Sequence, residues 1–213
     1  MKRKRPGLPE YPDRANLEQA VRRALDLDED VEKLAFEGEA LEGVEGVSLA
    51  FAGCVFRHVR FGENDIGHLS FTDCLLDHCD FSGFKVLEGS LHRVELISCR
   101  GLGAQFDRSV LRDALFQACR VGYLTLSESR LTNVEFADCE LENLLLYACA
   151  LKDAAFTGCR MPNAEVTGTS LKGVDLTSDD ISGLRAQLGC LEGAIISAAQ
   201  APELCALLGM KVR

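Results

Sequence analysis

Apolar residues recur along this chain with a period of five. Counting in fives from Val31 to Ile196 gives 34 positions, of which 32 are apolar. A composition that is 47% hydrophobic predicts about 16. The two exceptions, Gly46 and Gly101, are both glycine. Because a helix has a period of 3.6 and a strand a period of 2, this series indicates an internal repeat instead.

A second series of mostly small residues lies two positions before the first. It holds eight of the ten cysteines: Cys54, Cys74, Cys79, Cys99, Cys119, Cys139, Cys149 and Cys159. One large and one small inward position in every five residues predict a tightly turning chain. Each five-residue unit then forms one side of a square, with a turn at each corner.

Four such sides make a coil of 20 residues, so residues 20 apart stack at the ~4.8 Å spacing of neighbouring strands. The fold class predicted is an all-β solenoid, a right-handed quadrilateral β-helix of about eight coils. It spans residues 31–196, between an arm and capping helix in 1–30 and a C-terminal element in 197–213. Cysteines 20 apart form a ladder that we interpret as reduced, apolar core: Cys79, Cys99, Cys119, Cys139 and Cys159.

The corners of the square are predicted from the residues two after each central position. Many of these are Gly, Asn or Asp, which suit tight turns and tolerate the left-handed region. Examples are Gly53, Asp73, Asp113, Asn133, Asp153, Gly158 and Gly173.

Both ends of the solenoid are expected to be capped, because end coils expose core and unpaired strand edges. Residues 13–28 have the one-face apolar spacing of a helix, with Asp13 or Asn16 as its N-cap. We interpret this helix as a lid; a basic amphipathic membrane helix is the alternative.

A second helix is predicted over residues 198–208. Ser197 and Gln200 resemble a capping box, and Gly209 suits the C-terminal stop. Pro202 fits only a first helical turn, which moves the expected start toward Ala201.

This C-terminal segment is more apolar than a lid in water requires. We therefore expect a homodimer that buries the apolar residues across a symmetric interface; a monomer that uses them only as a cap is the alternative. The residues are Leu204, Leu207, Leu208, Met210 and Val212.

The net charge of −10 belongs entirely to residues 31–213. Residues 1–30 hold seven basic and seven acidic side chains, which leaves 16 basic and 26 acidic for residues 31–213. An acidic body disfavours direct nucleic-acid binding and favours basic protein partners, although solubility alone also explains it. The sequence has no run of ~18 apolar residues, so we expect no membrane span. No apolar run follows the basic Met1–Arg5 either, which argues against a secretory signal, and we expect a cytoplasmic protein.

Catalytic motifs for phosphate, zinc or serine chemistry do not occur in the sequence. His58 and His78 are 20 apart and should stack at a corner, with His68 on the opposite side. Stacked imidazoles could bind a metal, but the pattern supplies no third ligand, so exposed corner histidines are the simpler interpretation. We expect no enzyme activity, no metal and no cofactor.

Outward carboxylates are the better candidates for function. Within two adjoining columns the acids recur at every second coil, about 9.6 Å apart. They could imitate the charge of DNA or be ordinary solvated charge. One column holds Asp73, Asp113 and Asp153, with Arg93 and Asn133 between them, and the other holds Glu95, Glu135 and Asp175.

The central Leu or Phe, the small residue before it and the Gly after it resemble the pentapeptide repeat family over about 80% of the chain. Three stretches resemble its quinolone-resistance (Qnr-like) branch: Leu87-Glu88-Gly89-Ser90-Leu91-His92-Arg93-Val94, Ser170-Leu171-Lys172-Gly173-Val174-Asp175-Leu176 and Gly193-Ala194-Ile195-Ile196-Ser197. A helix and then Leu208-Gly209-Met210-Lys211-Val212 follow the third stretch. Some members carry loops that interrupt the repeats; this chain resembles the loop-free members.

The resemblance implies a homodimeric DNA mimic that binds DNA gyrase or topoisomerase IV and relieves quinolone inhibition. The other hypothesis is a pentapeptide-repeat scaffold with an unknown protein partner.

Overall fold

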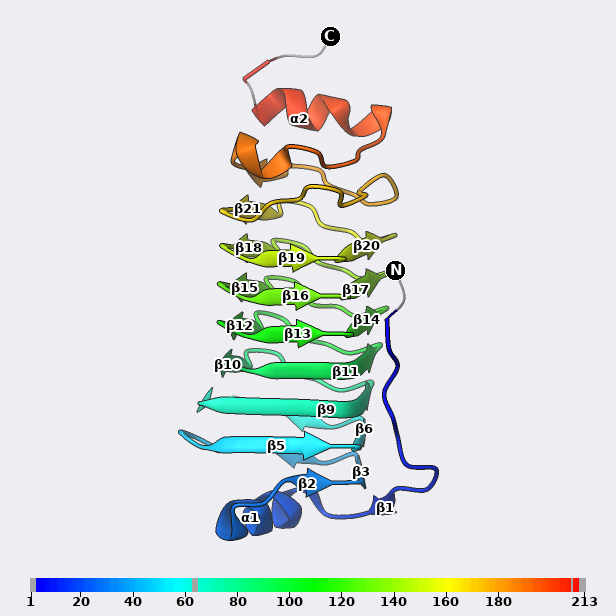
Figure 1. The fold of residues 1–213 in the computed structure, drawn as a ribbon, viewed down its shortest axis with the longest axis vertical. Helices are drawn as coiled ribbons and strands as arrows, with labels where there is room; N and C mark the ends of the chain where they lie inside the picture. The colour runs from blue at the N-terminus through cyan, green and yellow to red at the C-terminus, as the bar shows by residue number, and fades with distance from the viewer. Residues whose placement is uncertain (1–2, 63–64, 208, 211–213) are drawn as a thin grey trace.

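The computed structural model, which describes residues 3–62, 65–207 and 209–210, is a four-sided β-solenoid (Figure 1). Every strand pair within the solenoid is parallel with partners 20 residues apart, as in Leu91↔Leu111 and Phe116↔Phe136. The strands facing the viewer run from left to right while the chain rises, so the coil is right-handed. The predicted fold class is therefore confirmed.

Two of the four sides form one continuous sheet, because β9 and β11 run around the corner between them. The first side, the Val31 face, contains β2 (Val31–Glu32), β5 (Ser48–Ala52), the first part of β9 (His68–Asp77), the first part of β11 (Ser90–Ile97), β13 (Val110–Arg112), β16 (Arg130–Thr132) and β19 (Ala150–Lys152). The second side, the Phe36 face, contains β3 (Leu34–Glu37), β6 (Val55–Arg57), the ends of β9 and β11, β14 (Leu115–Gln117), β17 (Glu135–Ala137) and β20 (Ala155–Thr157).

The other two sides are less regular. The third has β4 (Ala40–Leu41) and β7 (Arg60–Phe61), followed by single bridges from Arg60↔Asp80 to Arg160↔Asp180. The fourth is a separate sheet of β8 (Asp65–Ile66), β10 (Lys85–Leu87), β12 (Gln105–Asp107), β15 (Thr125–Ser127), β18 (Leu145–Tyr147), β21 (Glu165–Thr167) and β22 (Arg185–Ala186).

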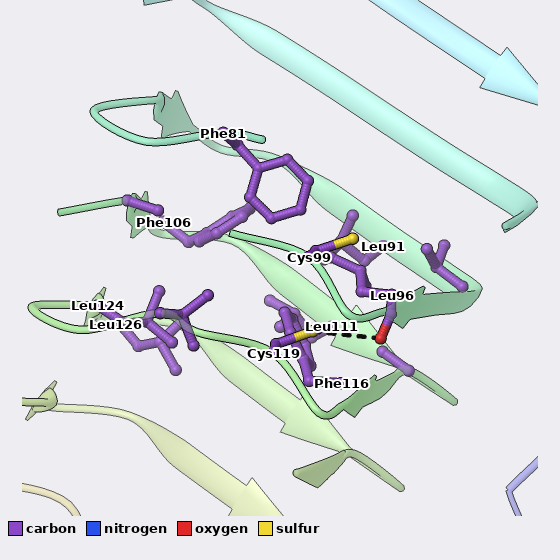
Figure 2. Packing of buried hydrophobic residues seen from close by; sticks show 14 of the residues in the cluster. Phe81, Leu91, Leu96, Cys99, Phe106, Leu111, Phe116, Cys119, Leu124 and Leu126 are labelled. Atoms are coloured by element: carbon purple, nitrogen blue, oxygen red, sulfur yellow. Dashed lines mark hydrogen bonds between the residues drawn. The ribbon is translucent and has the colours of Figure 1, made fainter. Parts of the chain in front are cut away.

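The interior is filled by columns of side chains from successive coils. Phe116, Phe136 and Phe156 stack with ring centroids 4.6 and 5.1 Å apart, and Figure 2 shows the apolar packing around Leu111 and Phe116. The eight cysteines of the small series are buried and free, as predicted, and donate to backbone carbonyls; the Cys119 thiol, for example, lies 3.3 Å from the Leu96 oxygen.

The glycine exception at position 101 has a packing cause. An added Cβ there would lie 2.9 Å from a methyl of Val121 and 3.0 Å from the ring of Phe81, so neighbouring coils occupy its space. The predicted corner residues adopt positive φ, as at Gly53 (65°) and Asn133 (54°).

The N-terminal lid is the helix α1 (Leu17–Leu27), which buries Leu17, Val21 and Ala24. Asn16 is its N-cap and accepts from the Gln19 amide at 3.0 Å. The helix begins at Leu17 and not at Asp13, because β1 (Asp13–Arg14) pairs with Leu34 and Ala35 of β3.

The C-terminal end follows the prediction more closely. After the short 3-10 helices η1 (Leu188–Leu191) and η2 (Ala198–Gln200), helix α2 (Ala201–Leu207) begins at Ala201. The Ser197–Gln200 capping box is present, and the Gln200 amide donates to the carbonyls of Leu176 and Asp179 at 2.7 Å each. None of the described helices has the length and apolarity needed to cross a bilayer.

Candidate partner-binding surface

The two predicted acid columns lie side by side at the corner between the Val31 and Phe36 faces. We call this the acidic corner and define it by six residues, Asp73, Asp113, Asp153, Glu95, Glu135 and Asp175. The 20-residue register brings the members of each column together, as predicted. Their surroundings differ sharply along the corner.

Asp73 is paired on both sides. Arg93, one coil further on, donates from Nε and Nη2 at 2.6 and 2.5 Å, and the Gly7 amide donates at 2.8 Å. The Arg93 hydrogen bonds are the main reason why the pKa of Asp73 lies below its usual value.

Asp113 was expected to point outward, but it is only 2% exposed. The Lys4 amide donates to its Oδ1 at 3.1 Å and the Asn133 amide at 3.2 Å, while Arg112 lies 3.8 Å from Oδ2. Asp113 is buried because a part of the chain remote in sequence, around Lys4, covers it, and the spacing of a column cannot reveal such a contact.

Glu95 forms an ion pair with Arg3 at 2.7 Å, with side chains 21% and 10% exposed. Arg3, Lys4 and Gly7 all belong to the N-terminal arm, residues 3–12, which descends along the corner toward β1 (Figure 1). These contacts were not predicted, although the sequence contains the basic residues and the regularly spaced prolines of the arm.

The other half of the corner is open. Asp153 and Asp175 are exposed and Glu135 is half-buried. In the described part of the chain, the side chains of Asp153 and Glu135 have no hydrogen bond or ion pair. Asp175 accepts only from Thr177, from its hydroxyl at 2.7 Å and its amide at 2.9 Å, and these bonds lower the pKa of Asp175.

Of the residues predicted for dimerisation, Leu204 and Leu207 lie on α2 and are half-buried, and Met210 is 51% exposed. Leu208 and Val212 lie outside the described residues. Two further exposed apolar side chains at this end, Leu188 and Ile195, were not predicted as contacts.

The thiol ladder ends at a carboxyl group. Asp179 takes the next inward position after Cys159 and accepts from its amide at 2.7 Å, while the second oxygen, Oδ2, is buried without a partner in the described structure. Burial raises the pKa of Asp179, and the nearby Asp175 adds to this effect.

Two pockets, of about 920 and 530 Å³, lie beside α1. Inside the coil, the described residues outline a void of about 20 Å³ between Phe61, Phe81 and Phe106, which is room for roughly one water. The ring centroids of His58 and His78 lie 5.2 Å apart in successive coils, as predicted, with the ring planes tilted by 39°. No cluster of three or more His, Cys, Asp or Glu in the described residues could hold a metal ion.

No family model and no curated protein matches this chain. Among solved structures, the chain is similar to QnrB1, a plasmid-mediated fluoroquinolone resistance protein, at 17% identity and a TM-score of 0.43, covering 85% of this chain and 98% of that one. It is also similar to HetL of Nostoc sp. strain PCC 7120, a pentapeptide repeat protein involved in heterocyst differentiation regulation, at 16% identity and a TM-score of 0.37, covering 85% and 97%. A third is the pentapeptide repeat protein Rfr23 of Cyanothece 51142, at 14% identity and a TM-score of 0.23, covering 84% and 99%.

Proposed function

We propose that this protein is a non-enzymatic, acidic interaction protein that binds a type II topoisomerase, DNA gyrase or topoisomerase IV, as a mimic of DNA. The observation that carries the proposal is that Asp73, Glu95 and Asp113 already bind a basic segment of the chain. Carboxylates that accept from guanidinium and amide groups of an arm can do the same for a basic partner.

Charge density limits how the mimicry would work. Duplex DNA carries one charge per ~1.7 Å of axis, whereas acids in each column recur about every 9.6 Å. The corner alone is therefore sparser than DNA, and a topoisomerase would have to contact other acidic faces of the solenoid as well.

We also propose that the protein is a homodimer joined through its C-terminal end. Exposed Met210, Leu188 and Ile195 and half-buried Leu204 and Leu207 supply apolar surface that a symmetric contact would cover. Light scattering should then give about twice the 23.2 kDa of one chain. A mass of one chain would contradict the dimer.

A scaffold role with another partner is the second candidate. It is favoured by the arm itself, because three of the six acids in the corner are already paired and the open surface is smaller than DNA mimicry requires. A scaffold of this kind predicts no effect on gyrase.

The test is a DNA supercoiling assay with gyrase, titrating this protein with and without ciprofloxacin. Rescue of the drug-inhibited enzyme, or inhibition without drug, supports the topoisomerase. The combined variant Glu135→Gln, Asp153→Asn and Asp175→Asn should weaken the effect, and raised salt should weaken it too. The charge-matched variant Glu45→Gln, Glu128→Gln and Glu142→Gln, at exposed acids away from the corner, measures how much the other acidic faces contribute. No effect at micromolar protein would favour the scaffold.

A further inference from the structure

We propose that the acidic corner is a binding channel for an extended basic chain that contacts it at every third residue, and that the N-terminal arm is its displaceable occupant. The inference rests on the proposed role of the acidic corner as a partner-binding surface and specifies what that surface recognises. The partner segment is a basic, proline-containing peptide in an extended conformation.

The spacing of the acids is the first argument. In each column they recur every 40 residues, two coils, or about 9.6 Å. Three residues of a polyproline II chain advance about 9.3 Å. The arm uses this match: the Lys4 amide donates to Asp113 and the Gly7 amide, three residues on, donates to Asp73, two coils away.

Burial along the arm repeats with the same period. Arg3 and the three prolines at 6, 9 and 12 are half-buried, and the two residues between each of these are exposed. A chain with three residues per turn presents such an edge. Proline also restricts the free chain, so less conformational entropy is lost when the arm binds.

The three positions of each three-residue unit of the arm therefore make different contacts. The first faces the solenoid, where Arg3 reaches Glu95; the second donates its amide to the Asp73 column; the third, such as Arg5, faces solvent. Opposite an acid of the Glu95 column, the recognised pattern is a cation, then any residue with an N–H, then any residue; elsewhere in the arm proline takes the first position.

The open half of the corner continues this register. Two coils beyond Asp113 lies Asp153, and two coils beyond Glu95 lies Glu135. A basic chain longer than the arm would place an amide on Asp153 and a cation on Glu135. Because it would gain these contacts in addition to those of the arm, such a chain would displace the arm.

The experiment uses the full chain and two fluorescent peptides of equal charge. One has five repeats of Arg-Lys-Pro, with a period of three, and the other has five repeats of Arg-Lys-Pro-Ser, with a period of four. Fluorescence anisotropy should give at least tenfold tighter binding for the first, and weaker binding at higher salt. Equal affinities would mean that the corner senses charge alone and would overturn the proposal.

The role of the arm is tested in the same assay. Arg3→Ala with Gly7→Pro removes the Glu95 ion pair and the amide that donates to Asp73, so it should raise the affinity for the period-three peptide about tenfold. Arg5→Ala removes the same charge from an exposed position and should change nothing. If both variants behave alike, the arm is not a competitor. Circular dichroism verifies that each variant is folded.

Two further substitutions separate this inference from the topoisomerase proposal. Asp153→Asn with Glu135→Gln should weaken peptide binding in the arm-released variant, whatever the supercoiling assay gives. No topoisomerase takes part in the peptide measurement. A failure in one assay therefore leaves the result of the other intact.

Discussion

The two halves of the acidic corner have the same columns and the same backbone but opposite surroundings. In the N-terminal half, Asp113 is 2% exposed and accepts from the arm and from Asn133. In the C-terminal half, Asp153 is exposed and has no side-chain partner in the described structure. Their φ angles are 55° and 54°. A repeat therefore specifies where a carboxylate is placed, whereas contacts from outside the repeat specify what it does.

The largest expected difference between the halves is in stability. Asp113→Ala should lower the free energy of unfolding by about 2 kcal/mol more than Asp153→Ala, because it leaves the donors of two part-buried hydrogen bonds, from Lys4 and Asn133, without their acceptor. Alanine would have to adopt the same left-handed backbone conformation at both positions, so the free-energy cost of that conformation cancels in the comparison. Urea unfolding of the two variants measures the difference, and equal losses would contradict the role assigned to the arm.

A buried acid outside the acidic corner, Asp179 at the end of the thiol ladder, should have the opposite effect on stability. Asp179→Cys extends the thiol ladder and removes a carboxylate that has one unpaired oxygen, so it should stabilise the protein by about 1 kcal/mol at pH 7. Because the pKa of Asp179 in the folded protein is raised, its penalty is absent below the ordinary aspartate pKa and grows as pH rises through the raised value.

The gain from Asp179→Cys should therefore shrink as unfolding is measured from pH 7 down to about pH 4. A gain that does not depend on pH would mean that packing, and not the charge on the carboxyl, is the cause.

The N-terminal half should show the reverse pH dependence. The pKa of Asp73 is lowered by Arg93, so its contribution is complete above the ordinary aspartate pKa and is lost as pH falls through the lowered value. Asp73→Asn should cost about 1 kcal/mol at pH 7, and this cost should decrease as pH falls below the ordinary aspartate pKa. Urea unfolding across this range measures it; a constant cost would point to geometry alone.

The smallest effect should come from Arg3. Its partly buried ion pair with Glu95 predicts that Arg3→Ala costs about 0.5 kcal/mol, and less at high salt. Hydrogen exchange is the more sensitive measurement, because the Lys4 and Gly7 amides should lose protection as the arm loosens. Arg5→Ala is the control, and equal exchange in both variants would mean that Arg3 does not hold the arm.

Much of the fold could be predicted because its causes are local or periodic. Inward positions recur every five residues, so Phe116 and Phe136 had to stack once a coil contained 20 residues. Asn16 and the Ser197–Gln200 pair act within one helical turn, so their caps were identifiable from neighbouring residues. Helix α1 was predicted too long, because the pairing of Asp13–Arg14 with β3 is not visible in local sequence.

The candidate surface, too, could be predicted only in part. The columns followed from the register, including the alignment of Asp73 with Asp113 and of Glu95 with Glu135. The arm contacts did not, since Lys4 and Asp113 are separated by 109 residues and Arg3 and Glu95 by 92. The basic residues of the arm and the three-residue spacing of Pro6, Pro9 and Pro12 were the available signals, and they indicate a basic, extended chain without indicating where that chain binds.

The sequence by itself determined the coil, its core and the position of every acid at the corner, because a strict repeat turns distance along the chain into distance in space. Only the tertiary structure decided which of those acids are buried and paired. An arm outside the repeat is not placed by the five-residue register, and its place depends on charge and shape complementarity with a surface that exists only after the solenoid has folded.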